Sequence, residues 1–164
     1  MNAVFFIAAA VALASTILVI VQRNAVHALL YLIISLFAVA VIFLVLGAPF
    51  AAALEVIIYA GAIMVLFVFA VMLVGAGTAS VPRTAWIGPA LLGAVLLAEI
   101  AYVLVYGGHA GALVSAPAQD VSPKQVGTSL IGSYLLGVEV AAFILLAGLI
   151  GTYRLGRREE KGQR

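Results

Sequence analysis

The stretch that decides the fold runs from Ala51 to Val74 and reads AAALEVIIYAGAIMVLFVFAVMLV. Its only charged residue is Glu55. The stretch is longer than the roughly 20 apolar residues that a helix needs to cross a bilayer. The apolar residues do not alternate with polar ones, as they would in a membrane β-barrel strand of about 10 residues. Since a backbone in lipid must satisfy its own hydrogen bonds, the stretch predicts a transmembrane helix.

The rest of the chain has the same character. Of its 164 residues, 66% are hydrophobic and 9% are charged, whereas a soluble domain is about half apolar and about a quarter charged. Short polar or Gly/Pro-containing breaks divide the apolar runs, which predicts an all-α integral membrane protein of five transmembrane helices. We expect a single membrane domain over 1–164, with spans at about 3–21, 26–46, 51–74, 86–106 and 128–153 and a basic, frayed tail at 154–164.

Composition also limits the chemistry. The chain has no cysteine, and its two histidines, His27 and His109, are far apart in sequence. Disulfides, iron–sulfur ligation and thiol catalysis within the chain are therefore excluded. The net charge of +2 comes mostly from the tail, which is too short to indicate nucleic-acid binding. We expect no cofactor in this chain, and a lipid bilayer rather than nucleic acid around it.

The basic residues predict an orientation. With five spans, Arg23, Arg83 and the five basic residues of the tail fall on one side of the membrane, and only Lys124 falls on the other. Cytoplasmic connections carry the excess of Lys and Arg. The N-terminus is therefore expected outside and the C-terminus in the cytoplasm or the equivalent compartment.

Three carboxylates, Glu55, Glu99 and Glu139, lie inside predicted spans that contain no Lys or Arg. An ionised group at mid-bilayer costs a few kcal/mol, about 2.5–3.5 on the gentlest scale. Each acid is therefore protonated, or water or a neighbouring subunit supplies its partner. One interpretation is a proton or ion path, and the other is a carboxyl solvated or hydrogen-bonded near the interface. We prefer the path for Glu55 and Glu139 and leave both interpretations open for Glu99.

The third span has the features of a gate. Glu55 and Tyr59 are four residues apart and share a helix face, so the phenol could donate to the carboxylate or relay a proton. Gly61 permits either close helix approach or an irregular turn. A bulky apolar run follows and would act as a dry plug. The predicted gate or hinge residues are Gly61, Met64, Val65 and Phe67.

The second span carries a polar face near its start. His27, Tyr31 and Ser35 follow one another at four-residue spacing. They could form a polar stripe through the membrane or hydrogen-bond a neighbouring helix. The second interpretation is preferred, with His27 as a structural residue at a helix interface.

Several runs of the sequence also resemble a known family. These are NAVHALLYLIIS over 24–35, ALEVIIYAGAIMVLFVF over 53–69, and the patch from Val126 to Leu149 around GVEVA at 137–141. They resemble subunit J of proton-pumping NADH:quinone oxidoreductase (respiratory complex I), whose mitochondrial counterpart is the sixth mitochondrially encoded NADH dehydrogenase subunit. The likeness covers all five predicted spans.

The sequence departs from that family in two places. The usual Asn-Pro before the second helix is Asn24-Ala25, which keeps the predicted N-cap but loses the proline of the first turn. The acid that some members carry after the third helix is absent between Gly75 and Ala85.

The resemblance implies a subunit that couples quinone reduction to proton translocation in the bacterial inner membrane. It implies packing beside the subunits called A, H and K, with flavin, iron–sulfur clusters and quinone held by other subunits. It also implies a π-bulge around Tyr59 and Gly61, whose loss would rotate the rest of the helix by about 100° and open a water path. The path residues are then Glu55, Tyr59 and Glu139.

Two other functions remain possible from the residues. The chain could be an ion-transport subunit of a related complex, such as a multisubunit cation/proton antiporter or a membrane-bound hydrogenase. It could instead be an assembly scaffold without a role in conduction, although the intramembrane acids argue against that.

Overall fold

The computed structural model describes residues 2–74, 86–106 and 121–162, and within these ranges all regular structure is helical. The chain divides into two compact units, Met1–Asp120 and Val121–Arg164, which are described separately. The first unit holds α1 (Asn2–Val21), α2 (Ala25–Val45), α3 (Pro49–Leu54), the π-helix η1 (Glu55–Ile63), α4 (Met64–Val74) and α5 (Ile87–Tyr106). The second unit holds α6 (Pro123–Ile131) and α7 (Leu135–Gly162).

The helices have the length and composition of membrane spans. Four helical stretches of the described chain are long and apolar enough to cross a bilayer, and Ile87–Val103 is a shorter apolar stretch. The predicted class is therefore confirmed as an all-α protein with several helices able to cross a membrane. The first four predicted spans also agree with the helix bounds to within a residue or two.

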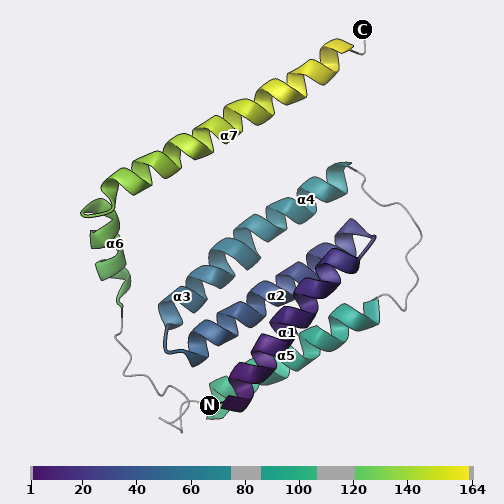
Figure 1. Ribbon diagram of the computed structural model, residues 1–164, viewed down its shortest axis with the longest axis vertical. Helices are drawn as coiled ribbons and strands as arrows, with labels where there is room; N and C mark the ends of the chain where they lie inside the picture. The colour runs from purple at the N-terminus through teal and green to yellow at the C-terminus, as the bar shows by residue number, and fades with distance from the viewer. Residues whose placement is uncertain (1, 75–85, 107–120, 163–164) are drawn as a thin grey trace. The chain divides into compact units, whose positions relative to one another are not determined.

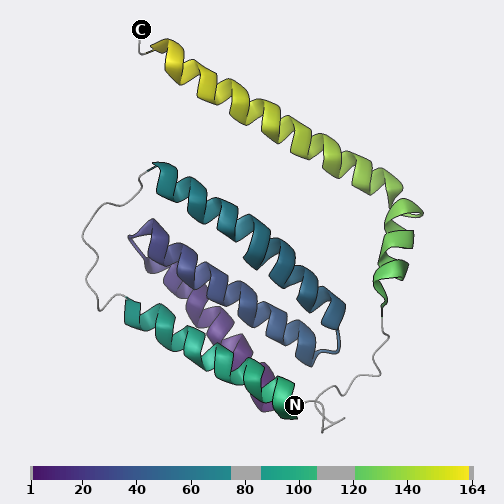
Figure 2. The same ribbon diagram turned by 180° about the vertical axis from the view of Figure 1, so that it is seen from behind.

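In the first unit, α2 lies at the centre (Figures 1 and 2). Helix α1 packs along α2, α5 contacts both of them, and the α3–η1–α4 helix lies along another side of α2. Valine and alanine make up most of the core, and its alanines allow the helix backbones to approach closely. The core cluster consists of Val4, Ala8, Val11, Ala12, Ala38, Val41, Val45 and Leu96.

Local signals in the sequence set the bounds of α2 and α3. The Oδ1 atom of Asn24 accepts hydrogen bonds from the backbone N–H groups of Val26 (3.0 Å) and His27 (3.3 Å), which confirms the predicted N-cap. After α2 the chain reverses through Gly47, whose φ of 79° favours glycine. Pro49 then begins α3, where its missing N–H costs nothing.

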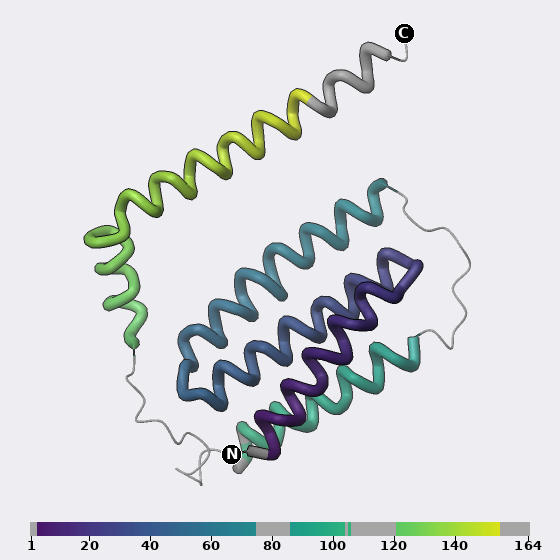
Figure 3. Tube along the Cα trace, viewed as in Figure 1, coloured from purple at the N-terminus to yellow at the C-terminus, as the bar shows by residue number. Residues whose placement is uncertain are grey.

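The predicted third span is one continuous helix over Pro49–Val74 (Figure 3). Its middle, however, is not a regular α-helix. The segment Glu55–Ile63 is π-helical. The backbone N–H of Met64 bonds to the carbonyl of Tyr59, five residues back, where an α-helix would bond four residues back. The widened turns therefore lie between the carboxylate of Glu55 and the apolar helix α4.

The prediction of one helix over 128–153 is wrong in two respects. Helix α6 already begins at Pro123, because Ser122 forms a capping box in which it accepts from the Gln125 N–H and the Gln125 side chain accepts from the Ser122 N–H. The helix then breaks at Gly132, where an added Cβ would lie 2.9 Å from the carbonyl oxygen of Thr128. A new helix, α7, begins at Leu135.

The predicted fraying of the tail is also wrong. Helix α7 continues through the basic segment to Gly162. Leu, Arg, Glu and Lys make up most of that segment, and all four are good helix formers.

Candidate proton-transfer site

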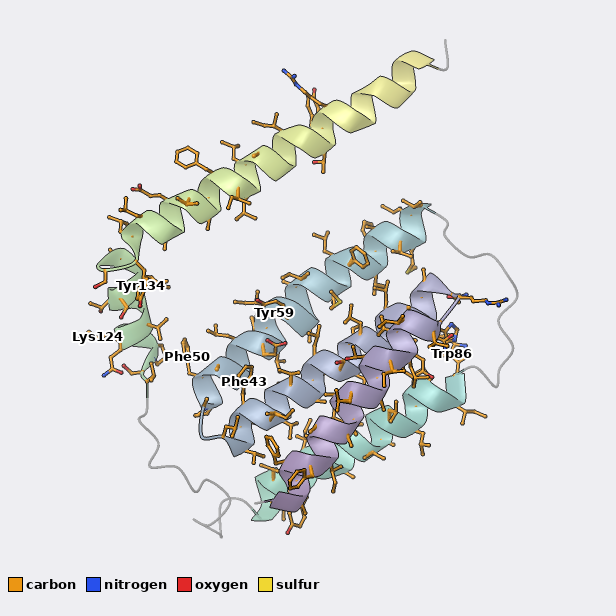
Figure 4. All side chains as sticks on the ribbon, viewed as in Figure 1. Phe43, Phe50, Tyr59, Trp86, Lys124 and Tyr134 are labelled. Atoms are coloured by element: carbon orange, nitrogen blue, oxygen red, sulfur yellow. The ribbon has the colours of Figure 1, made fainter. Side chains whose placement is uncertain are left out.

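Glu55 and Tyr59 both lie on η1 (Figure 4 labels Tyr59). Glu55 is half-buried, and the Tyr59 side chain is 50% exposed. Within the described part of the chain, neither side chain makes a hydrogen bond or ion pair. The hydrogen bond that their spacing would allow is therefore not formed, and each side chain is available to water or to a group from another subunit.

Gly61 is restricted by its own helix. A Cβ at this position would lie 3.0 Å from the carbonyl oxygen of Val56, five residues earlier, and no atom of another described helix comes within 4 Å of it. Of the two predicted roles, close helix approach is not seen within this chain. The irregular turn agrees with the π-helical backbone.

The side chains predicted to block water are mostly exposed rather than packed against other helices of this chain. Met64 is half-buried, whereas Val65 is 63% and Phe67 is 52% exposed. Helix α4 has no buried residue. Any barrier made by these side chains must therefore form against lipid or another polypeptide.

An apolar cavity of about 400 Å³ lies beside the π-helical segment. Val56 and Ile57 of η1 line it together with Phe37 and Leu44 of α2. This space leaves room for η1 to repack against α2.

Glu139 lies on α7, in the second unit, and is exposed. No hydrogen bond or ion pair reaches its side chain from the described residues. Its helix has no buried residue within the described range 135–154. Like Glu55, this acid depends on water or on another polypeptide for a partner.

Glu99 is the acid that sequence reasoning left open, and the structure buries it. The residue lies on α5, is 7% exposed, and has no hydrogen-bond partner for either carboxylate oxygen. Its neighbour in space is α1, which no local sequence signal around Glu99 could indicate. The only available signal was the cost of an acid inside an apolar span.

The polar face of α2 hydrogen-bonds α1 through Ser35, as the preferred interpretation predicted, whereas neither ring nitrogen of His27 has a hydrogen-bond partner among the described residues. The Ser35 hydroxyl lies 2.9 Å from that of Thr16 and donates to the carbonyl of Ala12 at 3.3 Å. His27 is 2% exposed and contacts Trp86 (labelled in Figure 4) edge to face, with ring centroids 5.2 Å apart. His27 is therefore buried near the start of α2, against the residue that directly precedes α5.

No metal centre is formed by the described residues, which contain no group of three or more His, Cys, Asp or Glu side chains. The geometry defines a class: a helical protein with several helices long and apolar enough to cross a membrane, in which Glu55 and Glu139 have no side-chain partner in the described part of the chain.

Comparison with known proteins gives the family. The model of NADH-ubiquinone/plastoquinone oxidoreductase chain 6 matches residues 15–155, and the chain belongs to this family. It is 49% identical to NADH-quinone oxidoreductase subunit J of Pseudomonas aeruginosa, over 98% of this chain and 99% of the relative. It is 45% identical to the subunit J of Escherichia coli K12, over 99% of this chain and 90% of the relative. The subunit J of Rhodobacter capsulatus is 34% identical, over 94% and 80%. These relatives are subunits of an enzyme complex, as the resemblance predicted.

Proposed function

We propose that this chain is a membrane-arm subunit that couples quinone reduction to proton translocation in the bacterial inner membrane. The names of its relatives and the coverage of the match support this role. Flavin, iron–sulfur clusters and quinone belong to other subunits in this proposal, and the chain is not catalytic alone. It packs beside the subunits A, H and K, with its N-terminus outside and its C-terminus in the cytoplasm.

One observation carries the mechanism: the π-helical segment begins at Glu55 and leads directly into the apolar residues of α4. A π-turn holds more residues than an α-turn. Conversion of η1 to a regular α-helix would therefore rotate α4 about its axis. The rotation is about 100° for each extra residue that the widened turns lose. This rotation also moves the apolar side chains of Met64, Val65 and Phe67, and so changes whether they block the water path.

The cost of this conversion must be small, a few kcal/mol at most, for the two forms to exchange during turnover. Two features favour a small cost. Gly61 has no Cβ to press on the Val56 carbonyl, and the cavity between η1 and α2 lets Val56 and Ile57 repack. The bulky apolar side chains block water in the π form and turn away in the regular form.

The proton route in this proposal begins at Glu55 and Tyr59, and Glu139 faces a neighbouring subunit. Carboxylates exchange protons through water or through a phenol such as Tyr59. Because these side chains lack partners within the described chain, the missing links are waters and residues of other subunits.

Two measurements test the proposal. The tagged chain should co-purify with a flavin- and iron–sulfur-containing complex whose NADH oxidation depends on quinone. Co-purification with a hydrogenase or a cation antiporter instead would support the alternative functions. Structures of the purified complex at rest and during turnover should show η1 in both helical forms. A single form in both conditions would contradict the gate.

A further inference from the structure

Beside Glu99, an open apolar groove of about 470 Å³ runs between α1 and α5. Its lining residues recur at helical spacing, so each helix presents one face to it. Two of them are alanines, and small residues are typical where another helix approaches closely. Helix α5 contributes Val95, Ala98, Glu99 and Tyr102, and α1 contributes Ala3 and Ile7.

The groove contains one group that the chain does not satisfy. Glu99 lines it and is more than nine-tenths buried. The backbone of Ala8 lies near its carboxylate, but neither carboxylate oxygen makes a hydrogen bond of ordinary geometry with the described residues. The helices of the first unit contain no Lys or Arg that could pair with it. Ionisable groups inside membranes face a protein interior and pair with one another, because lipid cannot solvate them.

The depth of Glu99 distinguishes between possible partners. It lies seven residues before Tyr106, the end of α5, which is roughly 10 Å along the helix. A lipid headgroup lies at the membrane surface, beyond the helix end. A side chain from a neighbouring transmembrane helix can be placed at any depth.

We propose that the α1–α5 groove is the docking site for a transmembrane helix of another subunit, and that this helix pairs a Lys or Arg with Glu99. Charge complementarity and the depth of the acid identify the partner. On docking, the Glu99 side chain turns from α1 into the groove. The inference rests on the proposed function only in that the chain must be part of a membrane complex.

The first test uses the intact complex with Glu99 unchanged. A photo-crosslinking amino acid replaces Ile7 in the groove, and a matched control replaces Leu97, which is exposed and does not line the groove. We expect Ile7 to crosslink to a single subunit, at a transmembrane peptide that contains Lys or Arg. The control should not yield that peptide.

Crosslinking of Ile7 only to phospholipid, or to a peptide without a basic residue, would overturn the inference while leaving the proposed function intact. Failure of the chain to purify with any membrane complex would instead overturn the proposed function.

The second test exchanges the charges. Glu99→Lys should reduce the amount of the crosslinked subunit in the complex, because two cations then meet in the groove. Replacing the partner's basic residue by Glu in the same strain should restore that subunit. A Glu99→Lys complex that retains the subunit fully, or a double variant without any recovery, would contradict the pairing.

Discussion

Exposure separates the three membrane acids more sharply than their sequence contexts do. Glu55 is half-buried on a π-helical segment, Glu139 is exposed on a long helix, and Glu99 is buried between two helices. A carboxyl group that the rest of its own chain leaves exposed can exchange protons with water or with a residue of a neighbouring subunit. The buried one needs a fixed partner, which is why a proton route is proposed for the first two and docking for the third.

At Gly61 we expect two substitutions to have graded effects. A Cβ would lie 3.0 Å from the Val56 carbonyl in the π form, and alanine also favours the α-helix over glycine by about 1 kcal/mol. Gly61→Ala should shift the two forms toward the regular helix and lower proton pumping moderately. Gly61→Val, which adds a branched side chain, should abolish quinone reduction and pumping together in an assembled complex.

The measurement compares assembly with activity in membrane vesicles, and Gly93→Ala is the control because nothing lies within 4 Å of its Cβ position. Full assembly of Gly61→Val with a normal rate and proton yield would leave Gly61 as a packing residue only.

Glu139→Gln removes a charge and keeps the size of the side chain. Because Glu139 is exposed on α7, its own helix should tolerate the change. We expect a several-fold loss of quinone-dependent proton pumping, with NADH oxidation by artificial acceptors near normal. Leu136→Gln, at an exposed position one turn earlier, controls for a polar amide on this helix. Unchanged pumping in Glu139→Gln would remove Glu139 from the route.

The helices of the first unit differ in how firmly they are held. Helix α2 is in contact with every other helix of that unit, whereas η1 buries only Ala60 and α4 buries nothing. Close packing holds a helix in one conformation, because a densely packed protein interior tolerates little change in volume. The lightly packed α3–η1–α4 helix is therefore the one free to change its turn, while α2 serves as its support.

The crossing of α2 and α5 offers a test of that support. Gly88 of α5 lies directly against the Tyr31 hydroxyl, which leaves no room for a Cβ. Gly88→Ala should destabilise the subunit by about 1–3 kcal/mol through overpacking. Adding Tyr31→Phe, which deletes the hydroxyl, should recover much of the loss. Thermal stability of the assembled complex gives the measurement, and equal stability of Gly88→Ala and the native subunit would refute the contact.

For the whole molecule, the charge distribution predicts the topology. Reporter fusions after Arg164 should be active on the cytoplasmic side, and fusions at Lys124 on the outer side, because the basic residues other than Lys124 share one side of the membrane. A fusion at Arg164 that is active only outside would reverse the orientation. The prediction for Arg164 and for the connection over 107–120 concerns positions outside the described residues.

The sequence by itself determined the helical class, the bounds of most spans and the positions of the acids. Apolar runs as long as Ala51–Val74 can satisfy their backbone in lipid only as helices, and Asn24 marks a helix start by its own hydrogen bonds. These are local properties, which depend on residues close together in the sequence and can therefore be predicted from it. The start of α6 could not be predicted from hydropathy, because the Ser122–Gln125 capping box begins the helix in a polar segment that precedes the apolar run.

Tertiary structure alone decided which polar groups are buried and which are open. Glu55 and Glu99 both lie in apolar runs, yet one is half-exposed and the other is enclosed by α1, a helix far away in sequence. The exposure of Val65 and Phe67 likewise depends on which helix lies opposite them. The physical reason is that burial is set by contacts between helices, and helical periodicity places residues on a face without identifying what that face meets.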